Sequence, residues 1–285
     1  MCWTIRTPLL TPRAVPPQGA GRTPDRFAAS GTSVIRTASV MTPFAALAGL
    51  ILSAAAASAG NPVPIETVAK VPVLVVEVDS RLAELDTLLK DPESYEKGKE
   101  LAIPSAAGVL ACIGHAVAQH PEKANAGLAP LKLRDAALEL AEAGDLDDAR
   151  KALAKLKEAR TTAEDAGDLA AQTWYDLIAS YELMEEINTR NSKLVRVSRR
   201  PRGKPEEQAH AAVIALLCLP MHAQGEDYVD EDQLPDYQAL TLRYLKESSE
   251  MSAAVEAKDG DAVKRLLVAS KKTCDECHKT YRDGE

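Results

Sequence analysis

Apolar residues recur along most of this chain three and four positions apart, the spacing that places side chains on one face of an α-helix. In residues 67–90, for example, Leu82, Leu85, Leu88 and Leu89 fall on a single stripe. Alanine, leucine, glutamate and lysine are frequent, and aromatic residues make up only 4% of the chain, a composition typical of helical proteins. We therefore expect an all-α fold.

Eight helices are predicted after the first sixty residues, each bounded by prolines, glycines or polar residues that commonly begin or end helices. They cover residues 67–90, 94–120, 123–143, 145–165, 168–198, 205–224, 234–258 and 261–282. Pro104 lies inside the second and should kink or interrupt it, because proline removes a backbone donor.

The eight helices form two sets of four, because the second set repeats features of the first. Residues 106–112 align without gaps over residues 212–218, and residues 148–156 resemble residues 261–269. We infer an internal duplication of a four-helix unit of roughly 110 residues, giving two tandem up-and-down bundles. The expected domains are residues 60–166 and 167–285. Two unrelated sets of helical hairpins are the alternative.

The N-terminal region has a different character. Residues 1–40 contain five prolines and five arginines against one acidic residue, which predicts a disordered leader or an over-extended start. Residues 41–59 form an apolar run that ends in Ala57-Ser58-Ala59, a small-residue pattern typical of a signal peptide cleaved after Ala59. A membrane anchor is the alternative, but the run is short and rich in alanine. We expect a protein exported to the periplasm.

Charge narrows the choice of partners. Residues 1–59 carry five of the 34 basic and one of the 42 acidic side chains, so cleavage after Ala59 would change the formal net charge from −8 to −12. An acidic surface disfavours binding to nucleic acid and to anionic membranes. Neither partner is expected for the mature protein.

The strongest chemical motif lies close to the C-terminus, where Cys274, Cys277 and His278 form a CxxCH sequence. Covalent attachment of haem c requires two thiols at this spacing followed by an imidazole that ligates the iron. On a helix these three positions share one face. Zinc binding would need two further ligands, and a thioredoxin-like pair would need a βαβ setting that the helical sequence does not offer. Haem is the interpretation that we favour.

The region from about residue 168 to the C-terminus resembles the class II c-type cytochromes, the family of cytochrome c′ and cytochrome c-556. In that family a four-helix bundle carries haem on its last helix, and CxxCH is followed by two residues, an aromatic residue and a basic residue. Cys274 to Arg282 matches this pattern, with Tyr281 as the aromatic residue and Arg282 as the basic one. The first unit has Thr161, Glu164 and Asp165 at the positions of Cys274, Cys277 and His278. It resembles a copy that cannot hold haem covalently.

The resemblance also implies roles for individual residues. His278 corresponds to the axial ligand, and the sixth ligand would come from the first helix of the bundle. Met184 is the only methionine on that predicted helix, and a thioether would suit electron transfer, although core filling is the ordinary role of methionine. Tyr181 and Asn188 are the polar residues beside this position, and Met221, His222 and Met251 are weaker candidate ligands.

These observations predict an exported cytochrome with one covalent haem c that carries single electrons between periplasmic redox proteins. A five-coordinate protein that binds nitric oxide or carbon monoxide is one alternative, and a helical interaction scaffold is another. The sequence contains no phosphate loop, GxSxG or HExxH motif, and we expect no enzymatic activity. Dimers are common in the family, so a homodimer is a candidate form. Basic residues between positions 193 and 204 are candidates for docking an acidic partner or for pairing with haem propionates, unless they form a solvated loop.

Overall fold

The computed structural model describes residues 61–282, and in this range the chain is built from nine α-helices and short 3₁₀ turns, with no strand. The predicted all-α fold is confirmed for this region. The leader and signal peptide predicted for residues 1–59 lie outside the described residues.

The first half of the described region contains five helices instead of the four predicted. The predicted second helix is divided into two, because residues 99–101 are not helical. Pro104 lies in the first turn of the second of these helices, where proline is tolerated. The predicted third helix begins seven residues late, at Pro130, which occupies its first position. The bounds are α1 Val71–Leu88, α2 Pro92–Gly98, α3 Ala102–Gln119, α4 Pro130–Ala141 and α5 Leu146–Thr161.

The second half contains four helices, and three of them match the predicted bounds to within two residues. The first is shorter than predicted, because residues 168–179 form two 3₁₀ turns capped by the side chains of Asp168 and Thr173. The bounds are α6 Ser180–Val197, α7 Pro205–Ala223, α8 Leu234–Glu256 and α9 Gly260–Tyr281.

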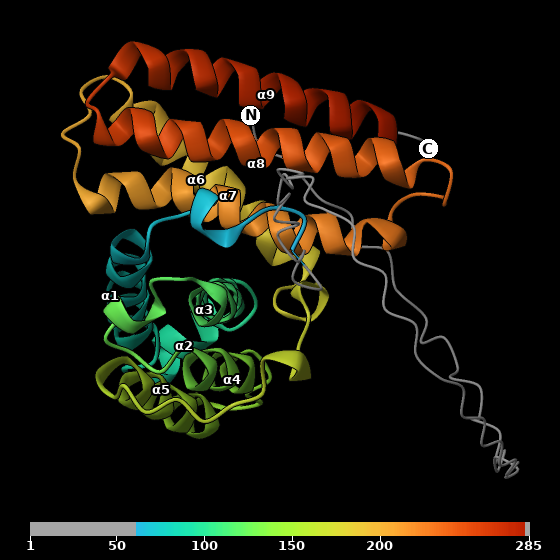
Figure 1. The fold of residues 1–285 in the computed structure, drawn as a ribbon. Helices are drawn as coiled ribbons and strands as arrows, with labels where there is room; N and C mark the ends of the chain where they lie inside the picture. The colour runs from blue at the N-terminus through green and yellow to red at the C-terminus, as the bar shows by residue number, and fades with distance from the viewer. Residues whose placement is uncertain (1–60, 283–285) are drawn as a thin grey trace, which may run out of the picture. The chain divides into compact units, whose positions relative to one another are not determined.

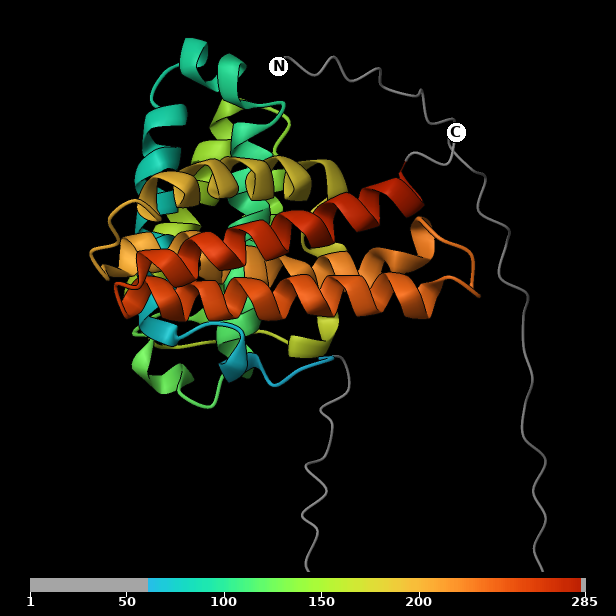
Figure 2. The same cartoon turned by 90° about the horizontal axis from the view of Figure 1, so that it is seen from above.

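In each half the four long helices form a closed ring of contacts, in which every helix packs against two others. In the first half α3 and α5 each contact both α1 and α4, and in the second half α7 and α9 each contact both α6 and α8. Figure 1 shows α6 to α9 running across the upper part of the view, with α1 to α5 gathered below them. Only three residues connect α8 to α9, and the two helices lie side by side in both views (Figure 2).

The core is continuous between the halves. Both α3 and α7 are buried over most of their length, and they contact each other as well as helices of the opposite half. In the described region α3 is the single helix long and apolar enough to cross a membrane, but 78% of it is buried inside the protein. Its apolar character is that of a core helix.

Candidate functional site

The last helix positions the CxxCH motif on the inner face of the second half. The carboxylate of Asp259 accepts a hydrogen bond from the backbone amide of Ala262 at 2.9 Å and so caps the start of α9. The helix then continues without interruption to Tyr281, and Cys274, Cys277 and His278 lie on the face that meets the other three helices. The sequence prediction that these three side chains share a face is confirmed.

A small pocket of about 80 Å³ lies in front of this face. Helix α9 supplies Cys274, Cys277, His278 and Thr273, and the remaining walls come from all three other helices of the half. The lining from α6, α7 and α8 consists of Met184, Ile187, Asn188, Met221, Leu240, Thr241 and Tyr244. The pocket therefore joins the CxxCH motif to the methionine that the sequence singled out.

The other predicted site residues differ in whether they line this pocket and in how far they are buried. Met184 is partly buried on α6 and lines the pocket together with the two cysteines and His278. Tyr281 is half-buried, and its ring meets that of Tyr237 edge-on with centroids 5.5 Å apart. Tyr181 is 51% exposed and does not line the pocket. Arg282 is exposed and follows the end of α9.

The two thiols lie in surroundings that keep them protonated. Burial raises the pKa of Cys274, and burial together with the neighbouring Cys274 raises the pKa of Cys277 to about 11. The reactive cysteine of a thioredoxin-like pair has a lowered pKa instead. Within residues 61–282 no group of three or more His, Cys, Asp and Glu side chains is arranged to hold a metal ion. The raised pKa values weigh against the redox-pair interpretation of CxxCH.

Helix α9 is held firmly on one side only. The Thr273 hydroxyl donates to the carboxylate of Glu247 at 2.9 Å, and Arg243 Nε donates to the Thr273 hydroxyl at 3.0 Å, so polar contacts join α9 to α8 beside the motif. The contact between α9 and α6 is the sparsest of the four around this half. The pocket lies at that contact.

The inner face of α9 is also less completely buried than that of its counterpart in the first half. Five apolar side chains of α5 are buried: Ala149, Ala152, Leu153, Leu156 and Ala159. On α9 the apolar side chains Leu266, Leu267, Cys274, Cys277 and Tyr281 are only partly buried. Helix α9 therefore leaves more apolar surface uncovered around the motif than α5 does at the corresponding positions.

The positions that align with CxxCH in the first half have a structural role. Thr161 is the last residue of α5, and Asp165 lies in the following segment. The Asp165 carboxylate accepts hydrogen bonds from the backbone amides of Leu131 and Lys132 at 3.0 and 3.1 Å. It therefore caps the start of α4, whose own N-cap residue, Ala129, has no side-chain acceptor.

Sequence reasoning missed the part of the pocket that comes from α8. Leu240, Thr241 and Tyr244 follow one another at intervals of one and three residues along that helix, so they share one face. Tyr244 is buried, and Asn191 Nδ2 donates to its hydroxyl at 3.1 Å from α6. The helical spacing was available in the sequence, but it does not say which neighbour that face meets.

The basic segment between α6 and α7 lies far from the motif. Gly260, the first residue of α9, packs against the Ser198 carbonyl and the ring of Pro201. Cys274 follows fourteen residues later on the same helix, which places it about 21 Å away at 1.5 Å per residue. The part of the segment around Ser198 and Pro201 therefore lies at the opposite end of α9 from the CxxCH motif.

No protein-family model matches the chain, and neither the curated proteins nor the solved structures give a match.

Proposed function

We propose that this protein is an exported c-type cytochrome that carries single electrons through one haem c attached at Cys274 and Cys277. The observation that carries the proposal is the pocket that both thiols and His278 line from α9 and Met184 lines from α6. Two vinyl-reactive thiols, an imidazole and a thioether are the donor groups that a His/Met-ligated haem c requires. The resemblance to the class II c-type cytochromes supports the same assignment.

The side chains that line the pocket fit this cofactor in their chemistry. The pocket is much smaller than the 300–1,000 Å³ of ordinary cofactor sites, so binding requires α6 and α9 to move apart. Such movement is favoured at this contact, because α9 is only sparsely packed against α6 and keeps apolar side chains partly exposed. A macrocycle between the two helices would cover those side chains.

In this proposal each side chain has one task. Cys274 and Cys277 would hold the haem through their thiols, and the His278 imidazole and the Met184 thioether would be the ligands of its iron. When bound, haem supplies a one-electron iron couple. Ile187, Leu240 and Tyr244 surround the site with largely apolar groups, which limit access of water and so influence the reduction potential.

We also propose that the closed contacts of each half represent an up-and-down four-helix bundle, with residues 60–166 as the haem-less unit and residues 167–285 as the haem unit. The protein would work in the periplasm, where c-type haem is attached, and would exchange electrons with redox proteins there. The polar residues of the pocket wall, Asn188 and Thr241, do not by themselves favour catalysis, and we propose no enzymatic reaction.

The test is a pyridine haemochrome spectrum of protein exported by a host with c-type haem maturation, taken after acid-acetone extraction. Haem that stays with the protein and has the α-band of two thioether links is expected. The matched control is the Cys274→Ala, Cys277→Ala variant, which should lose its colour on extraction. Colourless wild-type protein would contradict the proposal.

A five-coordinate protein that binds nitric oxide or carbon monoxide remains the second candidate, because it would use the same attachment site. The two differ in whether Met184 ligates iron. The presence of Met184 in the pocket wall favours six-coordinate iron and electron transfer.

A further inference from the structure

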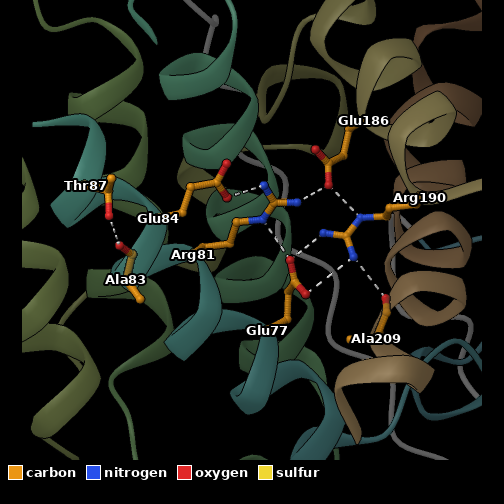
Figure 3. Close-up of polar contacts among 8 residues, drawn as sticks. All are labelled: Glu77, Arg81, Ala83, Glu84, Thr87, Glu186, Arg190 and Ala209. Carbon is orange, nitrogen blue, oxygen red and sulfur yellow. Dashed lines mark hydrogen bonds and ion pairs between the residues drawn. The ribbon is translucent and has the colours of Figure 1, made fainter. Parts of the chain in front are cut away.

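Four buried charged side chains join the two halves of the chain. Glu77 and Arg81 come from α1, and Glu186 and Arg190 come from α6 (Figure 3). Within each helix the arginine Nε donates to the glutamate four residues earlier, at 2.8 Å in α1 and 2.6 Å in α6. Between the helices Arg81 pairs with Glu186, and Arg190 pairs with Glu77. All four side chains are at most 8% exposed.

This arrangement is reciprocal. Helices α1 and α6 both carry the pattern E-x-x-x-R at the contact, and each glutamate binds the arginine of its own helix and that of the other helix. Exchanging α1 with α6 therefore reproduces the same four ion pairs. Such exchange is the property of an isologous interface, in which the same patch is used on both sides of a two-fold axis.

The surrounding helices repeat the reciprocity. Helices α3 and α7 are the counterparts that contain the aligned segments 106–112 and 212–218. Helix α1 packs against α7, α3 packs against α6, and α3 packs against α7. If the two halves are exchanged, the contact of α1 with α7 becomes the contact of α6 with α3, and the reverse. The contact of α3 with α7 is unchanged. The apolar contacts and the ion pairs thus share one pseudo-two-fold arrangement.

We infer that the haem-less first half occupies the position of the second copy in a symmetric dimer of four-helix units. The face formed by α6 and α7, which would otherwise bind another copy, is already covered within the chain. The first half is a built-in dimer partner, and the whole protein is a monomer in solution. This inference does not depend on the proposed haem, since none of the residues involved lines the pocket.

The ion pairs provide a way to test the pseudo-symmetry in the full chain. Reversal of the α1 charges, Glu77→Arg with Arg81→Glu, places like charges opposite each other between the helices, as does reversal on α6, Glu186→Arg with Arg190→Glu. Breaking buried pairs is strongly destabilising, so each reversal should lower the thermal midpoint by on the order of 10 °C. Combining both reversals restores opposite charges and should recover at least half of the summed loss. A combined variant whose thermal midpoint falls by the full sum of the two separate decreases would overturn the inference.

Molar mass by light scattering provides the second measurement. Wild-type protein should be monomeric at every concentration tested. In the α1 reversal the second half keeps a self-complementary face, with Glu186 of one molecule opposite Arg190 of another, so its mass should rise toward that of a dimer with concentration. The combined variant is the matched control and should stay monomeric. A wild-type dimer would overturn the inference even if a reversal variant failed to fold, and so would a folded α1 reversal that remained monomeric.

Discussion

Met184 is the residue on which the electronic properties of the proposed site depend. Its thioether shares the pocket with Cys274, Cys277 and His278, and thioether ligation favours ferrous haem. In haem-loaded protein we expect Met184→Ala to convert a low-spin spectrum to a high-spin one. The reduction potential should fall by on the order of 100 mV, a fraction of the roughly 0.8 V range that protein surroundings span. Absorption spectra and redox titration measure both effects.

Met221→Ala is the matched control for this change, because Met221 lines the same pocket from α7. It removes a similar apolar volume and should leave the spin state unchanged. If Met221→Ala changed the spin state and Met184→Ala did not, the assignment of the sixth ligand would be wrong.

His115 makes stability depend on pH in the first half. It is 5% exposed, its Nδ1 has no hydrogen-bond partner, and its ring packs edge-on against Trp174. Burial, helped by the positive charge of Arg134, lowers its pKa to about 4. Between about pH 6.5 and pH 4 the unfolded chain binds a proton that the folded protein does not, so stability falls as pH falls through this window.

The expected contribution of His115 is at most about 3 kcal/mol between pH 7 and pH 4. Urea unfolding of wild-type protein and His115→Phe should show a smaller loss of stability in the variant over this range. The two proteins should have the same pH dependence between pH 7 and pH 8, where both states are neutral at this position. Parallel curves from pH 7 to pH 4 would contradict the assignment.

At the scale of the helix, Asp165 does for α4 what an N-cap residue ordinarily does. Its carboxylate accepts from the amides of Leu131 and Lys132 across 34 and 33 positions of sequence. Asp165→Ala should therefore destabilise the protein by about 1 kcal/mol. Glu164→Ala is the control, because no bond to the Glu164 carboxylate supports α4, and it should cost much less. Thermal unfolding of the two variants decides the point, and equal losses would contradict the capping role.

Most helix bounds could be predicted from local signals, and the errors have local causes. Proline marked the starts of α7 and α8 correctly, because it acts through its own backbone, and α9 begins one residue before its predicted start. The start of α6 was placed twelve residues early. Residues 168–179 have helical composition, but the capping box of Thr173 and Asp176 closes a single 3₁₀ turn there. Composition cannot distinguish one capped turn from the beginning of a long helix.

At the scale of the whole molecule, the continuous core predicts that both halves unfold together. Leu156 is fully buried on α5 in the haem-less unit, and Leu156→Ala should cost about 2–5 kcal/mol. Far-ultraviolet circular dichroism, which follows the helices of both halves, and, in loaded protein, haem absorption should report the same midpoint in wild type and the same decrease in the variant. Two separate transitions would show that the halves are independent.

The sequence predicted the site more completely than the arrangement of the halves. Cys274, Cys277 and His278 could be placed on one face because their helical spacing restricts them to it, whereas Met184 could be singled out only through the resemblance to the class II c-type cytochromes. Glu77 and Arg190 pair although they lie 113 residues apart in the sequence. Each of them also has a partner four residues away on its own helix, which is the spacing of an ordinary surface ion pair. Burial between helices distant in sequence is not encoded by any local pattern.

The one-sided attachment of α9 has a consequence for how the protein could mature. We expect a helix bound through α8 but sparsely packed against α6 to open at a lower free energy than the core helices α3 and α7. Attachment enzymes could then reach both thiols while the first half and α7 remain folded. In haem-free protein, amide hydrogen exchange should be faster in α9 than in α3 or α7. Equal protection would mean that the thiols become accessible only when the whole chain unfolds.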